Sequence, residues 1–564
     1  MRRLVLGGVV GTILAVTPGL RAALPDPVSL DTGQVSGIAT STPDVRAFKG
    51  IPFAAPPVGE NRWRAPQPAP KWEGIRKADA FGSNCLAGAP GGGRGGRGGR
   101  GAAAAPGAAP APPAAPGVPG ARGAAAQAPA APAAPGGRGA APGGGAPPPA
   151  ASEDCLHVNV WTAAERNTER RPVMMWIYGG GFTGGSSSQG WYDGEQLAAK
   201  GAVVVTFNYR LGAFGFFAHP ELAKESGRNA SGNYGMMDAI AALQWIQRNI
   251  TAFGGDPTNV TVFGESAGAI MTAALVGSPQ AKGLFHRAIL QSGGWMGLQM
   301  NRMTSGEQAQ GNGVKAMQAL EAPSVAELRA RPLADLAGLS GSGLVIDGYL
   351  VPEDLSITFA QGRQNEVDII AGSNKDEATF FGGGTRTAQV HQDQAGQRFG
   401  ELAPEYMKFY PAASDTQAVT SYNDAYAHET NWHMRLAAQA QARKGKDAYV
   451  YYFTRVPLGA DGQPSPRGAT HTAEIRYAFN TRDGQVWDDV DRRLADTMSS
   501  YWVNFARTGN PNGQGLPNWP AFRDMQSGRA IVLGDTVQVE SSPFTPQLGF
   551  FDRAYQRLMR QIQG

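Results

Sequence analysis

Short apolar runs of strand length alternate with helical patterns over hundreds of residues, and this alternation strongly limits the possible folds. Residues 173–178 (VMMWIY) and 202–207 (AVVVTF) are largely apolar, as expected for strands buried on both faces of a parallel sheet. Residues 234–250 instead place apolar side chains at helical intervals. Further strands are expected at 260–263, 286–291, 368–371 and 448–453, and further helices at 267–275 and 491–507. The pattern predicts an α/β fold with a doubly wound, mostly parallel sheet.

One stretch departs from this alternation and explains the unusual composition. Gly and Pro number 77 and 41 among 564 residues, and they concentrate between residues 87 and 151. In that stretch 63 of 65 residues are Gly, Ala, Pro or Arg. Such a run cannot bury enough apolar surface to offset the entropy of ordering it, so we predict a disordered insert at 87–151. The remainder of 24–564 is predicted to form a single domain with long insertions.

The net charge of +4 does not indicate a nucleic-acid-binding protein. Eight arginines lie in the insert and in the first 22 residues, and neither segment contains an acidic residue. The remaining body therefore has a slight excess of acidic residues, which argues against a nucleic-acid partner. No later apolar run reaches the roughly 20 residues that a transmembrane helix needs, so no span is expected once the N-terminal segment is removed.

The N-terminus has the pattern of a secretory signal. Arg2 and Arg3 precede an apolar stretch at 4–16, and small residues follow at Ala22 and Ala23. We therefore predict that residues 1–23 form a cleaved signal peptide and that the protein is exported, either periplasmic or secreted. An uncleaved membrane anchor is the alternative.

The chain contains only two cysteines, Cys85 and Cys155. In an exported protein, one even pair predicts one disulfide, and this bond would close a loop around the whole insert. The chain-entropy model credits the closing of so long a loop with about 4 kcal/mol of stabilisation. Two buried free thiols are the alternative.

Residues 264–268 read Gly-Glu-Ser-Ala-Gly, a Gly-x-Ser-x-Gly pattern between a predicted strand and a predicted helix. A sharp strand-to-helix turn at this place would project the Ser266 side chain above the sheet, as a nucleophile elbow requires. In a chain so rich in glycine the pentapeptide alone is weak. Its position between strand and helix is what predicts a nucleophile.

Three glycines at 179–181 directly follow the strand predicted at 173–178. Acyl transfer builds negative charge on a carbonyl oxygen, and backbone N–H groups aimed at that oxygen stabilise it. Glycines let the main chain approach a substrate because no side chain intervenes. The run therefore predicts an oxyanion hole, to which the N–H of Ala267 would add a further donor. A flexible turn is the alternative.

A serine nucleophile needs a general base, and the order nucleophile, acid, base restricts the seven histidines to those after Ser266. His286 falls in the strand after the nucleophile helix and is predicted to be structural. His471 falls in a loop of small residues after the strand at 448–453. We predict His471 as the base, with His391 as the alternative.

The acid of such a triad should follow a strand that lies between the nucleophile and the base. The strand at 368–371 leads into Asp376 and Glu377, and either carboxylate could orient the imidazole. An acidic pair at this place could also mark the start of a helix.

Taken together, these features resemble the type B carboxylesterases, a family of α/β-hydrolases that includes the cholinesterases and bacterial carboxylesterases. The likeness runs from about residue 35 to residue 522 and is interrupted by the insert. It rests on ordered stretches at 48–57 (FKGIPFAAPP), 152–161 (SEDCLHVNVW), 208–212 (NYRLG), 253–257 (FGGDP) and 502–511 (WVNFARTGNP). So many matches in one order make the resemblance specific.

The resemblance implies a role for particular residues. It implies Glu377 rather than Asp376 as the triad acid, and it supports His471 as the base. It also implies that Ser292 and Glu474 form hydrogen bonds around the triad. Further residues supported by the resemblance are the oxyanion donors Gly180, Gly181 and Ala267 and the disulfide Cys85–Cys155.

The sequence thus predicts a serine carboxylic-ester hydrolase that acts on a small-molecule ester through an acyl-enzyme and needs no metal or organic cofactor. A lipase, or an esterase that cleaves a polyester or a toxin, is the alternative with the same mechanism. A non-catalytic adhesion protein of the same fold is disfavoured because the serine and the histidine are both present. The region between Cys85 and Cys155 contains no aromatic residue, so the resemblance does not support a choline esterase.

Overall fold

The computed structural model describes residues 24–87, 149–293, 303–336, 338–381, 386–523, 528–541 and 544–563. The predicted signal peptide at 1–23 and residues 88–148 of the predicted insert lie outside the described residues. Both of these, together with the assignment of 24–564 to a single domain, stay predictions.

A large mixed sheet forms the centre of the described structure. Its 11 strands follow the order β18-β17-β16-β15-β12-β11-β9-β10-β8-β4-β3. The parallel part consists of β10 (Val203–Phe207), β9 (Arg171–Ile177), β11 (Gly255–Glu265), β12 (Arg287–Gln291), β15 (Asp368–Asn374), β16 (Ala448–Phe453) and β17 (Arg529–Leu533). The antiparallel strands are β8 (His157–Thr162), β4 (Arg46–Pro52), β3 (Ile38–Ala39) and β18 (Val537–Ser541). The predicted doubly wound, mostly parallel sheet is confirmed.

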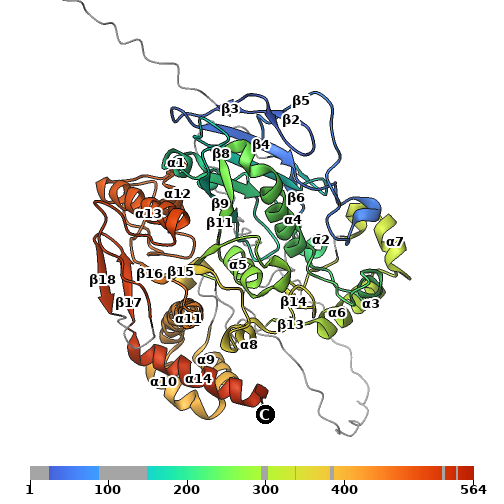
Figure 1. Cartoon of the computed structure of the whole chain (residues 1–564). Helices are drawn as coiled ribbons and strands as arrows, with labels where there is room; N and C mark the ends of the chain where they lie inside the picture. Colours follow the sequence, from blue (N-terminus) through green and yellow to red (C-terminus); the bar gives the residue numbers. More distant parts are fainter. Residues whose placement is uncertain are drawn as a thin grey trace, which may run out of the picture.

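Helices cover both faces of this sheet, which is why its central strands are apolar throughout. Every residue of β10 and β16 is buried. In Figure 1, α4 (Tyr234–Asn249) and α5 (Ala267–Gly277) lie on one side of the central strands, and α12 (Ile475–Phe479) and α13 (Asp489–Thr508) lie on the other. The predicted helices at 234–250, 267–275 and 491–507 correspond to α4, α5 and α13.

The remaining elements lie around this core. Helix α11 (Asp415–Arg443) packs on β15 and β16, and α14 (Thr545–Gln563) packs on α11 and α10 at the lower end of Figure 1. The other helices are α1 (Glu195–Ala199), α2 (Gly212–Phe216), α3 (Pro220–Glu225), α6 (Gly306–Ala319), α7 (Val325–Ala330), α8 (Leu355–Ala360), α9 (Ala388–Phe399) and α10 (Ala403–Phe409). The small sheets contain β1 (Val28–Ser29), β2 (Gln34–Ser36) and β5 (Ile75–Lys77), and the pair β13 (Thr304–Ser305) and β14 (Val345–Ile346).

The two ends of the insert meet at a short parallel ladder. Strand β6 (Asn84–Cys85) pairs with β7 (Ala151–Ser152), and the Asn84 N–H donates a 3.0 Å hydrogen bond to the carbonyl of Ala150. Residues 149–151, at the end of the predicted insert, are therefore described, and Ala151 takes part in backbone pairing with Asn84. Beside the ladder, Cys85 and Cys155 form a disulfide with a Cα–Cα distance of 5.0 Å.

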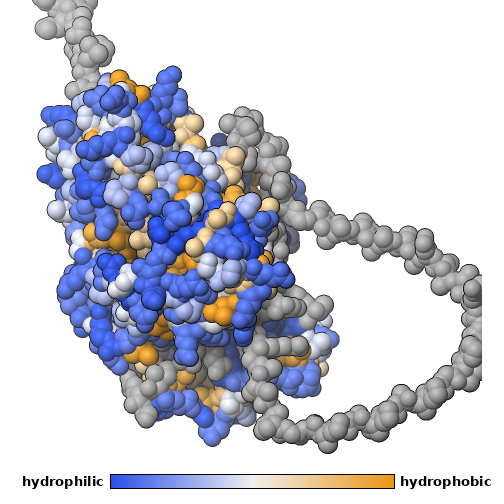
Figure 2. Space-filling model, turned by 90° about the vertical axis from the view of Figure 1, so that its right-hand side faces the viewer, coloured by the Kyte–Doolittle hydropathy of each residue, from blue (hydrophilic) through white to orange (hydrophobic). Residues whose placement is uncertain are grey.

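Within the described part of the chain, no helix is both long and apolar enough to cross a membrane. Figure 2 shows a face on which hydrophilic residues predominate and apolar residues appear only in small, scattered groups. Scattered apolar residues of this kind are ordinary on a protein surface and do not define a binding patch.

Candidate active site

Ser266 occupies a sharp turn of one residue between β11 and α5. Its backbone has φ 55° and ψ −124°, a conformation that a residue with a side chain rarely adopts. The turn requires glycine nearby, because a Cβ on Gly268 would lie 2.0 Å from the carbonyl oxygen of Ile177 in the neighbouring strand β9. The strained turn between strand and helix is the geometry of a nucleophile elbow.

The predicted oxyanion donors lie at the ends of two adjacent strands. Gly180 and Gly181 follow β9, and both have positive φ, 109° and 63° respectively. Ala267 is the first residue of α5, where a backbone N–H has no partner inside the helix. Within the part of the chain that the structure describes, no group accepts a hydrogen bond from these three N–H groups. They are therefore free to bind an external oxygen.

The structure brings Glu377 rather than Asp376 to the histidine. The Nδ1 atom of His471 lies 2.5 Å from Oε2 of Glu377, and the other oxygen of Glu377 accepts a 2.7 Å hydrogen bond from the Asn374 N–H. Both side chains are almost fully buried. A buried carboxylate on Nδ1 fixes the imidazole tautomer that leaves Nε2 available for proton transfer.

Asp376 instead holds the loop that carries the histidine. Its carboxylate accepts a 2.8 Å hydrogen bond from the N–H of Ala469, and its own N–H donates to the carbonyl of Ala469 at 3.0 Å. The Asn374 side chain donates a 2.9 Å bond to the carbonyl of Thr470. The acid loop and the histidine loop are thus joined immediately before His471.

The opposite side of the imidazole faces Glu265, the residue before the nucleophile. Nε2 of His471 lies 3.0 Å from Oε1 of Glu265, although the two atoms are poorly aligned for a hydrogen bond. In this structure no hydrogen bond joins the Ser266 hydroxyl to His471. The ring therefore lies between two buried carboxylates, one of which belongs to Glu265, the residue before Ser266.

These carboxylates control the protonation of the ring. Burial by itself would lower the pKa of His471, but the charges of Glu265 and Glu377 outweigh burial and raise it well above the usual 6.5. Burial also raises the pKa of Glu265, while the nearby His471 opposes this shift. Since the base must be neutral to accept a proton, the two carboxylates determine the pH at which His471 becomes competent.

Glu474 and Ser292, which the resemblance placed around the triad, lie behind it. The two oxygens of Glu474 accept hydrogen bonds from the side chains of Gln291, at 3.1 Å, and Asn374, at 2.5 Å. Burial, with a smaller contribution from the Glu265 charge, raises the pKa of Glu474 to about 8. Ser292 ends β12 with φ 54°, and its buried hydroxyl makes no hydrogen bond to the described residues.

The other histidines considered from the sequence lie away from the triad. His286 accepts a 3.1 Å hydrogen bond from the Val260 N–H and joins neighbouring strands, as a structural residue would. His391, the alternative base, is buried in α9 and contacts the carbonyl of Tyr410. Among the described residues no group of three or more His, Cys, Asp or Glu is arranged to hold a metal ion.

Three residues near the histidine were not predicted from the sequence. Glu265 is the variable position before the serine of the motif, and its position beside the nucleophile was the only available signal. Phe380 and Phe381 follow Glu377, and their ring centroids lie 5.5 Å and 5.3 Å from that of His471. Both phenylalanines are exposed, so they offer an aromatic surface next to the imidazole.

The sequence profile of the carboxylesterase family matches residues 25–551. The chain belongs to this family. Over 530 residues it is 33% identical to the fumonisin B1 esterase of Sphingopyxis macrogoltabida, covering 90% of this chain and 86% of the relative. It is 31% identical over 540 residues to the para-nitrobenzyl esterase of Bacillus subtilis, covering 92% of this chain and 96% of that protein.

Solved structures agree with this assignment. A para-nitrobenzyl esterase structure superimposes with a TM-score of 0.72 at 29% identity, covering 93% of this chain and 98% of the other. A Geobacillus stearothermophilus carboxylesterase gives a TM-score of 0.69 at 29% identity, covering 93% and 99%. This carboxylesterase family member therefore has the α/β-hydrolase fold and is a carboxylic ester hydrolase.

Proposed function

We propose that this carboxylesterase cleaves its ester through a Ser266–His471–Glu377 triad and a covalent acyl-enzyme. The observation that carries the proposal is the position of His471, which is bound to Glu377 on one side and lies next to the elbow residue Glu265 on the other. Nucleophile, acid and base follow one another in the chain, as Ser266, Glu377 and His471, in the order that the fold requires.

In the first half of the reaction, Nε2 of His471 leaves Glu265 and takes the proton of the Ser266 hydroxyl as its oxygen attacks the ester carbonyl. The Ser266 oxygen forms a bond to the carbonyl carbon, and the carbonyl oxygen becomes an oxyanion. The N–H groups of Gly180, Gly181 and Ala267 stabilise that charge, because none of them donates a hydrogen bond to another described residue before the substrate binds.

In the second half, His471 returns its proton to the departing alcohol and an acyl-Ser266 ester remains. Water, deprotonated by His471, then attacks the acyl carbon. The bond from that carbon to Oγ of Ser266 breaks, His471 returns the proton to the Ser266 oxygen, and the carboxylic acid is released. Glu377 keeps the imidazole in one tautomer throughout and stabilises its charged form. Every proton is carried by a group of the chain, so the scheme uses no cofactor.

The exposed pair Phe380 and Phe381 supports a substrate with an apolar group next to the scissile ester. Their rings lie beside His471 and continue through Phe381 to Tyr426, with centroids 5.6 Å apart. Two relatives are named for different esters, fumonisin B1 and para-nitrobenzyl esters, so the family name alone does not identify the substrate. A series of p-nitrophenyl esters from acetate to palmitate would define the acyl length that this chain prefers.

We also propose that the chain works outside the cytoplasm, based on its basic and apolar N-terminal segment and its Cys85–Cys155 disulfide. N-terminal sequencing of the protein expressed in a bacterium with intact export would test this. Recovery of a mature protein that begins near residue 24 supports the proposal, and recovery of the full chain in the cytosol contradicts it.

The triad itself is tested by covalent labelling with a p-nitrophenyl phosphonate, followed by peptide mass spectrometry. We expect stoichiometric modification of Ser266 with loss of turnover. Ser292→Ala is a matched control, because Ser292 ends the neighbouring strand with almost the same φ as Ser266. Ser292→Ala should still be labelled at Ser266. Labelling at any other residue, with turnover lost, would disprove the assignment.

A further inference from the structure

His471 lies in a long segment, 454–474, that connects β16 with α12 and contains no helix or strand of its own. Segments of this length without secondary structure are uncommon in compact domains and need tertiary contacts to hold one conformation. The acid loop holds this segment close to His471, through Asp376 and Asn374. A second set of contacts holds its two ends.

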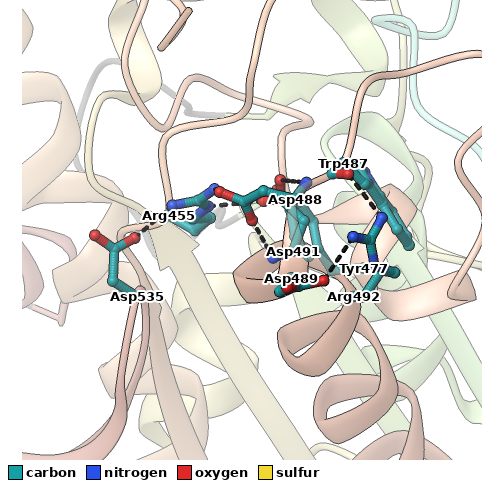
Figure 3. A network of polar contacts seen from close by, with 8 residues as sticks. All are labelled: Arg455, Tyr477, Trp487, Asp488, Asp489, Asp491, Arg492 and Asp535. Carbon is teal, nitrogen blue, oxygen red and sulfur yellow. Dashed lines mark hydrogen bonds and ion pairs between the residues drawn. The ribbon is translucent and has the colours of Figure 1, made fainter. Parts of the chain in front are cut away.

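Figure 3 shows these contacts around Arg455, the second residue after β16. Nε of Arg455 donates to Oδ1 of Asp491 at 2.7 Å, and the hydroxyl of Tyr477 donates to the same oxygen at 2.7 Å. Arg455 is the second residue of the histidine segment, and Tyr477 follows the segment, in α12. One carboxylate oxygen therefore joins the beginning and the end of the segment, and we call Arg455, Asp491 and Tyr477 the base clamp.

The base clamp is fixed to rigid parts of the fold. Asp491 is fully buried and forms a capping box with Asp488 at the start of α13. The other two nitrogens of the guanidinium reach Asp488 and Asp535, each at 2.8 Å. Asp535 lies between β17 and β18, so Arg455 connects the histidine segment to a helix and to the sheet.

Packing restricts Tyr477 in the same place. Its ring stacks on Trp487 at a centroid distance of 5.4 Å and contacts Phe453, the last residue of β16, at 5.2 Å. The N–H of Tyr477 donates to the carbonyl of Glu474, three residues after His471. A shift of Tyr477 is therefore transmitted to the backbone that carries the imidazole.

We propose that the base clamp positions His471, keeping its ring in register with Glu377 and the Ser266 elbow. Arg455 touches neither the triad nor the oxyanion donors, so it acts through the segment that it closes. The proposal rests on the triad proposed above. A displacement of about 1 Å at a catalytic group can reduce turnover by about 100-fold, so loosening the segment should affect kcat more than KM.

The test compares wild type with Arg455→Met and Tyr477→Phe. Three measurements are made on each: kcat and KM, the pH at which kcat/KM falls on the acid side, and the downfield proton resonance of the His471–Glu377 hydrogen bond. We expect kcat to fall at least tenfold in Arg455→Met, with KM nearly unchanged. The acid limb should move to lower pH and the resonance should weaken, because Glu377 and Glu265 would no longer hold the ring as closely.

Two further variants, Tyr477→Phe and Arg455→Lys, allow the test to be read even if Arg455→Met does not fold. Tyr477→Phe removes one hydrogen bond from the base clamp and leaves the ring packing, so it should fold and show the same changes at smaller size. Arg455→Lys keeps a cation and should recover part of the kcat that Arg455→Met loses. If Arg455→Met fails to fold, Tyr477→Phe carries the decision.

Arg62→Met is the matched control. The Arg62 guanidinium pairs with Glu153 at 2.6 Å, both side chains are as buried as Arg455, and the pair lies away from the histidine segment. Arg62→Met should lower the melting temperature and leave the acid limb and the resonance at their wild-type positions. Folded base-clamp variants with wild-type kcat, acid limb and resonance would overturn the proposal.

The resonance is read without substrate, which separates this proposal from the one on which it rests. Full activity of Ser266→Ala would refute the triad whatever the resonance does. An unchanged resonance in folded Arg455→Met and Tyr477→Phe, with Ser266→Ala inactive, would refute the base clamp alone.

Discussion

The proposed nucleophile and the proposed general base are held in place in different ways. Ser266 stands in a one-residue turn whose shape follows from a strand, a helix and two glycines within five residues. His471 stands in the segment 454–474, which has no regular structure and is held by Asp376, Asn374 and the base clamp. Of the two carboxylates beside His471, Glu377 lies 94 positions away in the chain, and Glu265 lies still farther away.

Ser266 is positioned mainly by the strand and the helix next to it in the chain, whereas His471 is positioned by hydrogen bonds between distant parts of the fold. The elbow is strained, and backbone groups of the neighbouring strands hold it: the Ser266 N–H donates to the carbonyl of Gln291 at 2.9 Å, and Gly268 packs on the carbonyl of Ile177. The position of His471 depends on many individually modest hydrogen bonds, each of which contributes roughly 0.5–1.5 kcal/mol. Substitutions far from the site should therefore displace His471, whereas only substitutions in the elbow itself should displace Ser266.

The largest effect is expected from removing the reacting groups. Ser266→Ala and His471→Ala should each reduce kcat/KM by about 10⁴-fold or more, since members of a triad act as a unit. Melting temperature should change little for Ser266→Ala, because serine and alanine are similarly strained in the elbow. Steady-state hydrolysis of p-nitrophenyl butyrate measures the loss. Wild-type activity in purified Ser266→Ala would contradict the assignment of the nucleophile.

The second expected effect is a difference in rigidity between the Ser266 elbow and the loop that carries His471. A Cβ on Gly268 would meet the backbone oxygen of Ile177 at 2.0 Å, whereas one on Gly468 would meet the Asp376 side chain at 2.2 Å. A carboxylate can move and a strand carbonyl cannot. We expect Gly468→Ala to lower the free energy of unfolding by about 1–3 kcal/mol, as for a side chain forced to positive φ, and Gly268→Ala to lower it by more.

Thermal and denaturant unfolding of the two glycine variants, with kcat measured on each, provides the comparison. Gly468→Ala should lose activity through a displaced His471 while remaining folded. Equal destabilisation by the two substitutions would show that the elbow is no more rigid than the histidine loop.

A third, smaller effect concerns pH. Catalysis needs neutral imidazole, so activity should be lost as pH falls through the pKa of His471, which the two carboxylates raise above 6.5. Glu265→Gln removes one of these charges and should move the acid limb of kcat/KM to lower pH. Glu474→Gln is the control, because that carboxylate contacts Gln291 and Asn374 rather than the ring. An acid limb that stays in place in Glu265→Gln would contradict the role given to this residue.

The smallest effect concerns the charge of the substrate. It tests whether the loop that carries Glu377 also determines a preference for charged or neutral esters. A quaternary ammonium over an aromatic ring gains about 0.5–2 kcal/mol. The region between the cysteines has no aromatic residue, and Phe380 and Phe381 are the described aromatic rings in contact with His471. We expect kcat/KM for butyrylcholine to exceed that for 3,3-dimethylbutyl butyrate, its neutral isostere, by less than tenfold.

Phe380→Ala completes that experiment. It should slow hydrolysis of both esters to a similar extent, because it removes an apolar contact that the two alcohols share. A choline preference of tenfold or more that disappears in Phe380→Ala would instead identify the phenylalanine as a cation site.

The two sides of the site also differ in how well the sequence predicts them. The elbow could be placed to the residue, because its strand, serine and helix are adjacent in the chain and each leaves a local pattern. The main sheet was predictable for the same reason, since its central strands are continuous apolar runs. The edge strands β3 and β18 were not predicted, because β3 has only two residues and neither strand contains a fully buried residue.

The histidine side was predictable only in part. Its place in a loop of small residues after the strand at 448–453 favoured His471, since chain order alone left His391 as a rival. The sequence pattern left Asp376 and Glu377 equivalent, and the resemblance to a family favoured Glu377. What separates the two carboxylates is a reciprocal pair of bonds between Asp376 and Ala469, which are 93 residues apart. The contacts of Glu265 with His471 and of Arg455 with Asp491 also join residues far apart in the chain, and no local sequence pattern predicts them.

The ladder of β6 and β7, with the Cys85–Cys155 bond beside it, has a consequence for how this protein can vary. The described chain stops at residue 87 and resumes at 149, and the β6–β7 pairing and the disulfide join these two ends in a junction that we call the neck. Doubling a flexible connection closed in this way costs only about 0.6 kcal/mol. At the neck the chain can therefore gain or lose tens of residues without a change in the fold of the catalytic body. A foreign domain whose termini lie close together could be inserted at the same place.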